Sequence, residues 1–205
     1  MPHKNEARPR GRPRAFDEAA VRQAALAAFW TRGFSGVSLD DLAAATGVAR
    51  PSLAAAFGSK RDLYLSAVDA FLKQFSAAAA TMLTGVKPLA HELTAFYDGA
   101  LQLYMSGSHG PRGCLAICTL PAEATNDAAI RQVLKAAVEA TDAALRARFE
   151  LAIKKRDLKP TADASALGQM ASSLLFSLAI RARAGASKRD LKAMIHGGVE
   201  VLARA

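Results

Sequence analysis

The sequence predicts an all-α protein with about nine helices, and three observations support this fold class. Apolar residues recur at the three- and four-residue spacing of an amphipathic helix along most of the chain. No segment alternates apolar and polar residues as a half-buried strand does. Ser-x-x-Asp pairs, which are typical of helix starts, occur at Ser38, Ser59 and Ser187. With 205 residues, 51% of them hydrophobic, the chain can build one large helical domain or two smaller ones.

The net charge of +9 is distributed unevenly along the chain. Residues 1–14 carry a net +4 and residues 15–62 are neutral, while the remaining excess is spread over residues 63–205. A basic chain favours a polyanionic partner, although a generally basic surface gives the same total. The excess of positive charge in residues 1–14 therefore makes that segment the first candidate for contact with a polyanion.

The cysteine content and the apolar runs indicate a cellular compartment. Two cysteines do not make a disulfide framework, so a reducing cytosol is the natural environment. No apolar run approaches the roughly 18 residues that span a bilayer. The charged N-terminus has no apolar stretch after it and does not resemble a secretory signal. We expect a soluble, cytoplasmic protein.

Residues 1–14 are rich in proline, arginine and glycine and have no apolar period, so we expect a disordered basic arm. The stretch from Arg10 to Pro13 resembles an AT-hook, an extended segment that lies in the minor groove of DNA. Arginine side chains suit a narrow groove with a negative potential. Arg10, Arg12 and Arg14 are therefore candidate DNA contacts, and the alternative is a tail that only improves solubility.

A first helix is expected from Asp17 to Arg32. Residues 38–60 then predict two short helices joined by a tight turn. Gly47 follows the first of them, where only glycine adopts a left-handed backbone at little cost. Pro51 is tolerated in the first turn of the second helix. This spacing is typical of a helix-turn-helix, whose second helix enters a DNA major groove.

A long helix from the Ser59 cap to about Leu83 is expected to link this unit to the rest of the chain. The segment 170–180 is apolar on nearly every side, so the last helices carry more apolar surface than a small bundle buries, which favours a subunit interface. Further helices are expected at about 88–105, 114–125 with a kink or break at Pro121, 126–156, 162–183 and from Ser187 onward.

Residues 11–75 resemble the N-terminal domain of the TetR family of transcriptional regulators. The resemblance depends on GRPRAFD at 11–17 and on ALAAFWTRGFSGVSLDDLAAATGVARPSLAAAFGSKRDLY at 25–64. It combines an arm, a helix, a complete helix-turn-helix and the start of a fourth helix. The other two-thirds resembles the family only in architecture, with Gly113-Cys114-Leu115 recurring in part of it.

The resemblance implies a homodimer that is joined through the last two helices. The two recognition helices would then read a palindromic operator about one DNA turn apart. Family members usually repress transcription and release DNA when a small molecule binds in the C-terminal domain. We therefore divide the chain into a basic arm (1–14), a helix-turn-helix DNA-binding domain (15–62) and a helical effector-binding and dimerisation domain (63–205).

The resemblance also implies which residues contact DNA. Phosphate contacts are expected at two helix starts, groove contacts along the second helix, and one residue lies at the turn. These residues are Ser38 and Lys60 for phosphates, Arg50, Pro51, Ser52 and Ala55 for the groove, and Thr46 at the turn.

Three alanines depart from the family pattern. The family commonly has a polar residue in place of Ala49, an aromatic residue in place of Ala54, and tyrosine or histidine in place of Ala56. Arg50 is then the one long side chain on this helix, and it can contact guanine or a phosphate. We therefore expect DNA affinity to depend on the arginine arm more than the motif suggests.

Candidate ligand-binding residues come from the helices of the C-terminal domain. An apolar pocket with a few polar groups is the usual form of a small-molecule site, and plain core packing is the alternative for each residue. Tyr97 and Tyr104 offer the best polar groups, and the sequence does not identify the effector. The candidates are Phe71, Phe75, Phe96, Tyr97, Tyr104, Phe149, Met170 and Phe176.

Cys114 and Cys118 are four residues apart, so a redox-sensing or electrophile-sensing regulator is an alternative to a ligand-responsive one. Buried cysteine as a small apolar side chain is the other interpretation. His109 alone does not complete a zinc site, and we predict no metal and no cofactor. The chain has no phosphate-binding glycine loop, nucleophile elbow or H-E-x-x-H motif, so we predict no enzyme. A helical carrier or enzyme without DNA function remains the alternative from another class.

Overall fold

The computed structural model describes residues 16–107 and 110–205, which lie entirely in helices and the loops between them. The predicted all-α fold is confirmed for these residues. The basic arm, with Arg10, Arg12 and Arg14, lies outside them, and so does His109. The helices are α1 (Glu18–Arg32), α2 (Leu39–Thr46), α3 (Arg50–Phe57), α4 (Lys60–Met82), α5 (Leu89–Met105), α6 (Leu115–Ala124), α7 (Ala128–Lys154), α8 (Ala164–Arg183) and α9 (Lys188–Ala203).

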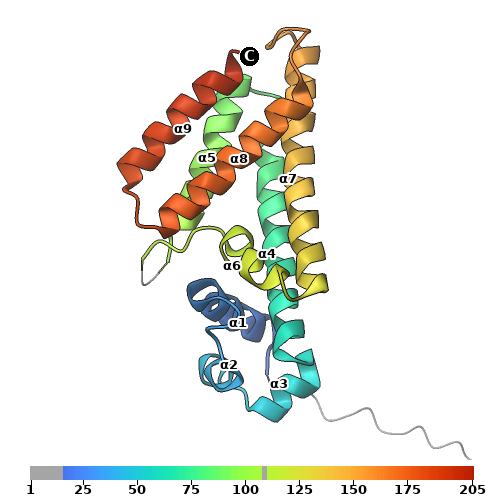
Figure 1. The fold of residues 1–205 in the computed structure, drawn as a ribbon, viewed down its shortest axis with the longest axis vertical. Coiled ribbons are helices and arrows are strands. Elements are labelled where there is room, and N and C mark those ends of the chain that lie inside the picture. The colour runs from blue at the N-terminus through green and yellow to red at the C-terminus, as the bar shows by residue number, and fades with distance from the viewer. Residues whose placement is uncertain (1–15, 108–109) are drawn as a thin grey trace, which may run out of the picture.

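The molecule is elongated, with the helix-turn-helix unit at one end and the last two helices at the other (Figure 1). Helix α4 leaves the small N-terminal unit and runs beside α7 into the larger helical domain (Figure 1). Its unbroken course from Lys60 to Met82 makes it a continuous element between the two parts. The boundary that we drew after residue 62 therefore falls inside its first turn.

The helix starts predicted from the three Ser-x-x-Asp pairs are confirmed. Ser38 and Ser59 each form a complete capping box, with Asp41 and Asp62 respectively. Ser187 accepts a hydrogen bond from the backbone N–H of Asp190 at the start of α9. Each pair supplies acceptors for N–H groups that have no partner inside the helix.

Two helices begin two residues later than predicted, and no break is found at Pro121, where a kink or break is expected. Helices α7 and α8 begin after Asp127 and Asp163, whose carboxylates accept two backbone N–H bonds each. Helix α6 continues through Pro121 to Ala124 without a break. Proline removes only its own N–H bond, so the turns on either side can still form.

Aromatic packing joins the N-terminal unit to α4. The ring of Phe29 lies 5.1 Å from that of Tyr64, and the ring of Trp30 lies 4.8 Å from that of Phe71, both nearly perpendicular. Edge-to-face pairs of this kind add about 0.5–1.5 kcal/mol to the effect of area burial. The α1–α4 contact is therefore a firm part of the core.

A buried ion pair stabilises the far end of the larger domain. Arg148 Nε in α7 donates to Glu92 Oε2 in α5 at 2.6 Å, and the two side chains are 0% and 3% exposed. Glu92 also accepts from the backbone N–H groups of Gly85 and Lys87 and from the hydroxyl of Thr84. The pair thus connects α7, α5 and the loop between α4 and α5.

Candidate functional site

Helices α2 and α3 form the predicted helix-turn-helix. Gly47 adopts the left-handed conformation, with φ 69° and ψ 13°, which confirms the turn. Leu42 and Leu53 are buried and hold the two helices together. Asp41 closes the capping box and also accepts from Arg32 Nη1 at 2.9 Å. The hydrogen bonds from Ser38 and from Arg32 hold the pKa of Asp41 well below its usual range, so it remains ionised.

The outer face of α3 is exposed and carries few polar groups. Arg50, Pro51, Ser52 and Ala55 are all exposed, as the groove-facing positions require. The guanidinium of Arg50 lies 3.1 Å from a carboxylate oxygen of Asp40 in α2. Both side chains of this pair are more than half exposed, so its ion pair is weak and can be exchanged for another partner.

The three remaining DNA candidates already make internal hydrogen bonds. The hydroxyl of Ser38 bonds to Asp41, and the hydroxyl of Thr46 donates to the carbonyl of Leu42 at 2.7 Å. Lys60 Nζ donates to the carbonyls of Phe34 and Val37 at 3.1 and 2.9 Å. These groups hold the helix-turn-helix together, and the phosphate contacts predicted for Ser38 and Lys60 remain predictions, as does a DNA contact of Thr46 at the turn.

A seam of polar contacts joins the helix-turn-helix unit to the larger domain. Trp30 Nε1 donates to the carbonyl of Gly113 at 3.0 Å, and Arg183 Nη1 donates to the carbonyls of Trp30 and Arg112. The hydroxyl of Tyr64 bonds to that of Thr119, and burial raises the pKa of Tyr64 to about 12. Further contacts are Ser35 with Glu123, Arg61 with Asp127, and Arg183 with Thr31.

Gly113 occupies a close approach within this seam. Its φ is 66°, and a Cβ added there would lie 2.5 Å from the carbonyl oxygen of Ala179 and 2.8 Å from the sulfur of Cys118. Both its conformation and its surroundings therefore require glycine. The loop after α5 consequently lies directly against α8.

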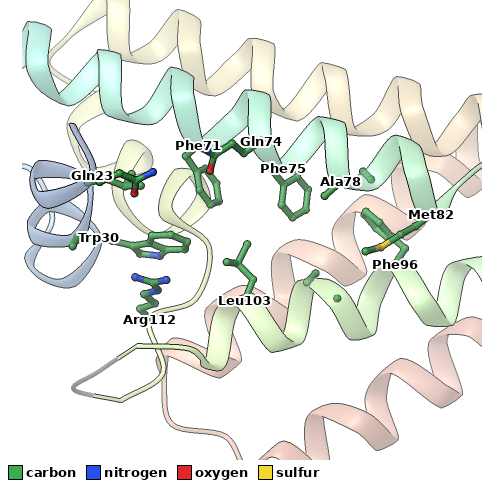
Figure 2. Close-up of a pocket in the computed structure, with 15 residues that line it drawn as sticks. Gln23, Trp30, Phe71, Gln74, Phe75, Ala78, Met82, Phe96, Leu103 and Arg112 are labelled. Atoms are coloured by element: carbon green, nitrogen blue, oxygen red, sulfur yellow. The ribbon is translucent and has the colours of Figure 1, made fainter. Parts of the chain in front are cut away.

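A cavity of about 420 Å³ lies between α1, α4 and α5 (Figure 2). Trp30 and Arg112 lie at the end nearest α1, and Met82 and Phe96 lie at the opposite end (Figure 2). Most of the lining is apolar, and three side chains supply longer polar groups. The lining includes Gln23, Trp30, Phe71, Gln74, Phe75, Met82, Phe96, Gly99, Leu103 and Arg112.

The structure places only part of the predicted ligand set at this cavity. Phe71, Phe75 and Phe96 line it. Phe75 and Phe96 also border a second cavity of about 580 Å³, which is lined by α4 and by alanines of α7.

The other predicted ligand residues border neither cavity. Tyr97, Tyr104 and Phe149 are fully buried in the core. The hydroxyl of Tyr97 donates to the carbonyl of Ala171 at 2.8 Å, and burial raises the pKa of both tyrosines. These hydroxyls are therefore not polar groups for a ligand in either cavity. Met170 is 53% exposed on α8, and Phe176 is partly buried in the same helix.

Two residues at this cavity were missed by the analysis of the sequence. Trp30 is not among the predicted ligand residues and its side chain is only 3% exposed, yet it also forms part of the cavity wall. Arg112 is not among the predicted ligand residues, and it lines the cavity. No local signal marks either residue, because the cavity forms where α1 meets a loop about 80 residues later in the chain.

Burial makes both cysteine thiols weak acids. Cys114 is 7% exposed, and burial raises the pKa of its thiol to about 11. Cys118 is partly buried, and burial raises its pKa as well. A reactive thiolate needs an exposed site with a lowered pKa, and neither cysteine has one.

The described residues contain neither a cluster of metal-binding side chains nor a membrane-spanning helix. No group of three or more histidine, cysteine or acidic side chains is arranged to hold a metal ion in residues 16–107 and 110–205. Over the same ranges, none of the helices combines the length and the apolar character that crossing a bilayer demands.

Comparisons with known proteins agree with this geometry. Residues 21–67 match the family described as bacterial regulatory proteins, tetR family. The HTH-type transcriptional repressor ComR of Escherichia coli K12 is 28% identical over 184 residues, which cover 89% of this chain and 87% of ComR.

Solved structures show the same fold over nearly the whole chain. A cysteine mutant of the TetR family regulator CifR, in complex with 26-bp operator DNA, is 29% identical, with a TM-score of 0.82 and coverage of 93% of this chain and 98% of that one. A putative TetR regulator from Rhodococcus sp. RHA1 is 30% identical, with a TM-score of 0.56 and coverage of 92% and 100%. This chain therefore belongs to the TetR family and is a helix-turn-helix, DNA-binding transcriptional regulator.

Proposed function

We propose that this protein is a dimeric repressor that binds a palindromic operator through α3 and releases it when a small apolar effector binds. The observation that carries the proposal is the joining of an exposed α3 face, by the continuous helix α4, to a domain with an apolar cavity. ComR is named a transcriptional repressor, and the CifR structure contains operator DNA. A regulator of this kind would act in the cytoplasm.

The dimer is supported by exposed apolar side chains on the last two helices. Met170 and Ile180 in α8 are 53% and 54% exposed, and Val201 in α9 is 64% exposed. Exposed apolar side chains of this size on neighbouring helices are typical of a subunit interface. A two-fold axis there would place two α3 helices in successive major grooves of a palindrome.

The proposed DNA contacts fall into two groups. The α3 residues would read the groove, with Arg50 exchanging Asp40 for a base or a phosphate. Ser38, Thr46 and Lys60 would lie close to the backbone. Arg10, Arg12 and Arg14 of the arm would add minor-groove contacts, which explains how a helix-turn-helix with few polar groups could still bind tightly.

The decisive experiment is selection of bound sequences from random duplex DNA. We expect one palindromic sequence and an affinity that falls steeply with salt, because neutralised phosphates release counterions. Deleting residues 1–14 should lower the affinity and flatten the salt dependence. Recovery of no sequence from the selection would contradict the proposed function, and an unchanged salt dependence would contradict the role of the arm.

The thiol-sensing alternative loses support from the structure. Both cysteines lie against α8 or in the core, and burial favours their protonated form. An effector that binds without covalent chemistry is the simpler regulator. If oxidant released DNA from the wild-type protein but not from Cys114→Ser, the thiol mechanism would replace the one proposed here.

A further inference from the structure

The polar end of the cavity between α1, α4 and α5 contains a cation without a partner for one of its donors. The guanidinium of Arg112 stacks on the ring of Trp30, with Cζ 3.7 Å from the ring centroid. Its Nη2 donates to the hydroxyl of Ser106 at 3.1 Å. Its Nε is buried and has no hydrogen-bond partner, and no ion pair to Arg112 is found among the described residues.

This arrangement is unfavourable for a charged side chain. A buried donor without an acceptor destabilises the fold, and the effect is larger for a charged group. Burial also lowers the pKa of Arg112, which still leaves the guanidinium charged at neutral pH. Because Arg112 lines the cavity, a ligand carboxylate bound there would supply the missing counter-charge to the guanidinium.

The rest of the cavity is suited to an apolar group. From the Arg112 end the wall passes Phe71 and Leu103 and reaches Phe75, Met82 and Phe96 (Figure 2). The amides of Gln23 and Gln74 are the other long polar groups of the lining. Gln23 lies on α1, and Gln74 lies on α4 beside Phe71 (Figure 2). The cavity is therefore polar at one end and apolar at the other.

We propose that the effector is an amphipathic carboxylate, with its carboxylate bound to Arg112 and its apolar body lying between α4 and α5. Charge-assisted hydrogen bonds to a guanidinium are about twice as strong as neutral ones, and a partly buried site strengthens them further. A neutral apolar compound would fill the same space but leave the charge unpaired. The proposal deepens the effector-released repressor proposed above and rests on it.

The same residue connects the ligand to the DNA-binding unit. The side chain of Arg112 stacks on Trp30 of α1. Arg183 Nη1 also donates to the backbone carbonyls of both Trp30 and Arg112. The cavity wall itself includes Gln23, Leu26 and Trp30 of α1. A carboxylate that reorients Arg112 would therefore change the position of α1 relative to α4. By linkage, operator DNA should weaken carboxylate binding by the same factor by which the carboxylate weakens operator binding.

The single tryptophan of the chain provides a direct measurement, because Trp30 lies in the site. Decanoate and phenylbutyrate are titrated into the full-length protein while tryptophan fluorescence is followed, with decanol and methyl decanoate as neutral controls. We expect saturable binding of the carboxylates that is at least about tenfold tighter than binding of the neutral compounds. Equal affinity for both classes would overturn the proposal.

Two variants separate the two ends of the cavity. Arg112→Gln should remove the preference for carboxylates while leaving decanol binding unchanged, and Arg181→Gln, at an exposed position on α8, should change neither. Gly99→Leu adds a side chain beside Met82 at the apolar end and leaves Arg112 in place. It should weaken decanoate far more than propionate. If Arg112→Gln retained the preference, the guanidinium would not be the anion site.

Operator binding is measured on the same samples to keep the two proposals distinct. Carboxylate binding with the expected selectivity but no selected DNA would contradict the repressor and leave the binding site intact. Operator binding with no carboxylate selectivity would contradict the site and leave the repressor intact. Loss of operator affinity on addition of decanoate in wild type, but not in Arg112→Gln, would support both.

Discussion

Two arginine–carboxylate pairs in this molecule have similar geometry and opposite surroundings. Arg50 and Asp40 meet at 3.1 Å on the surface of the helix-turn-helix, where their side chains are 55% and 75% exposed. Arg148 and Glu92 meet at 2.6 Å inside the larger domain, where exposure is 0% and 3%. Water screens the first pair, so it is worth about 0–1 kcal/mol and can exchange partners. Removing one member of the second pair leaves a buried charge, which costs about 3–5 kcal/mol.

The same contrast extends to the two regions as a whole. Helix α3 carries alanine at three successive positions, Ala54 to Ala56, and Arg50 is its one long polar side chain. The seam behind it contains several hydrogen bonds between elements far apart in sequence. The contacts that fix the position of the helix-turn-helix unit are therefore more numerous than the polar side chains that could read DNA. In the proposed mechanism, an effector needs only to change the position of that unit.

The largest effect is expected from breaking the buried pair. Glu92→Gln keeps the shape of the side chain but leaves Arg148 charged and uncompensated, so we expect the free energy of unfolding to fall by about 3–5 kcal/mol. Denaturant titration measures this loss. Asp40→Asn is the matched exposed control. A loss under about 1 kcal/mol in Glu92→Gln would show that the two pairs are not energetically distinct.

The pH dependence of stability should reveal the same pair. Burial alone would raise the pKa of Glu92, but hydrogen bonds from Lys87, Gly85, Arg148 and Thr84 outweigh it and lower the pKa from 4.5 to about 2. The carboxylate therefore stabilises the fold fully above pH 4.5, and this contribution is lost as the pH falls toward 2. Since one pKa unit corresponds to about 1.4 kcal/mol, the loss is on the order of 3 kcal/mol.

Chemical denaturation at a series of pH values checks this prediction. Glu92→Gln should lack this component, while other carboxylates such as Asp41 and Asp62, whose pKa values are also lowered, continue to contribute in both proteins. Identical pH profiles for wild type and variant would mean that Glu92 is not the group responsible.

An intermediate effect is expected at the DNA-facing side. Arg50→Ala should reduce discrimination at one base-pair position of the selected operator by about 1–3 kcal/mol, with little change in unfolding free energy. Competition binding with operators altered at single positions measures this. Arg189→Ala, at an exposed position in α9, serves as the control. If all sequences weaken equally, Arg50 contacts a phosphate and not a base.

The smallest effect is expected from the partner of Arg50. Asp40→Asn should change the unfolding free energy by no more than about 0.5 kcal/mol, because the pair is exposed. It also removes a negative charge beside the recognition helix, so operator affinity should rise at low salt and return to the wild-type value as salt screens the charge. Lower affinity in the variant would mean that Asp40 positions Arg50 for DNA.

Local signals made much of the fold predictable. Ser38, Ser59 and Ser187 mark helix starts through bonds to residues three positions away, and Gly47 marks a turn through its own backbone. These effects need no knowledge of the rest of the chain. The starts of α7 and α8 were misplaced because Asp127 and Asp163, which also act locally, were not recognised as caps.

The cavity could not be predicted in the same way. An aromatic residue at helical spacing is equally suited to a core and to a cavity wall, so the spacing does not separate Tyr97, which is in the core, from Phe75, which lines the cavity. The hydroxyl of Tyr97 meets the carbonyl of Ala171, which is 74 positions away in sequence. Arg112 and Trp30 likewise meet only through tertiary packing.

Gly113 controls how closely the loop after α5 approaches both α1 and α8. Its carbonyl fixes the indole of Trp30, and its missing side chain lets the loop lie against the backbone of α8 near Ala179. Even one methyl group there would displace the loop and shift α1 relative to α8. Such a change would leave every residue of α2 and α3 intact. In the proposed dimer it would still set the two α3 helices at the wrong separation for the operator.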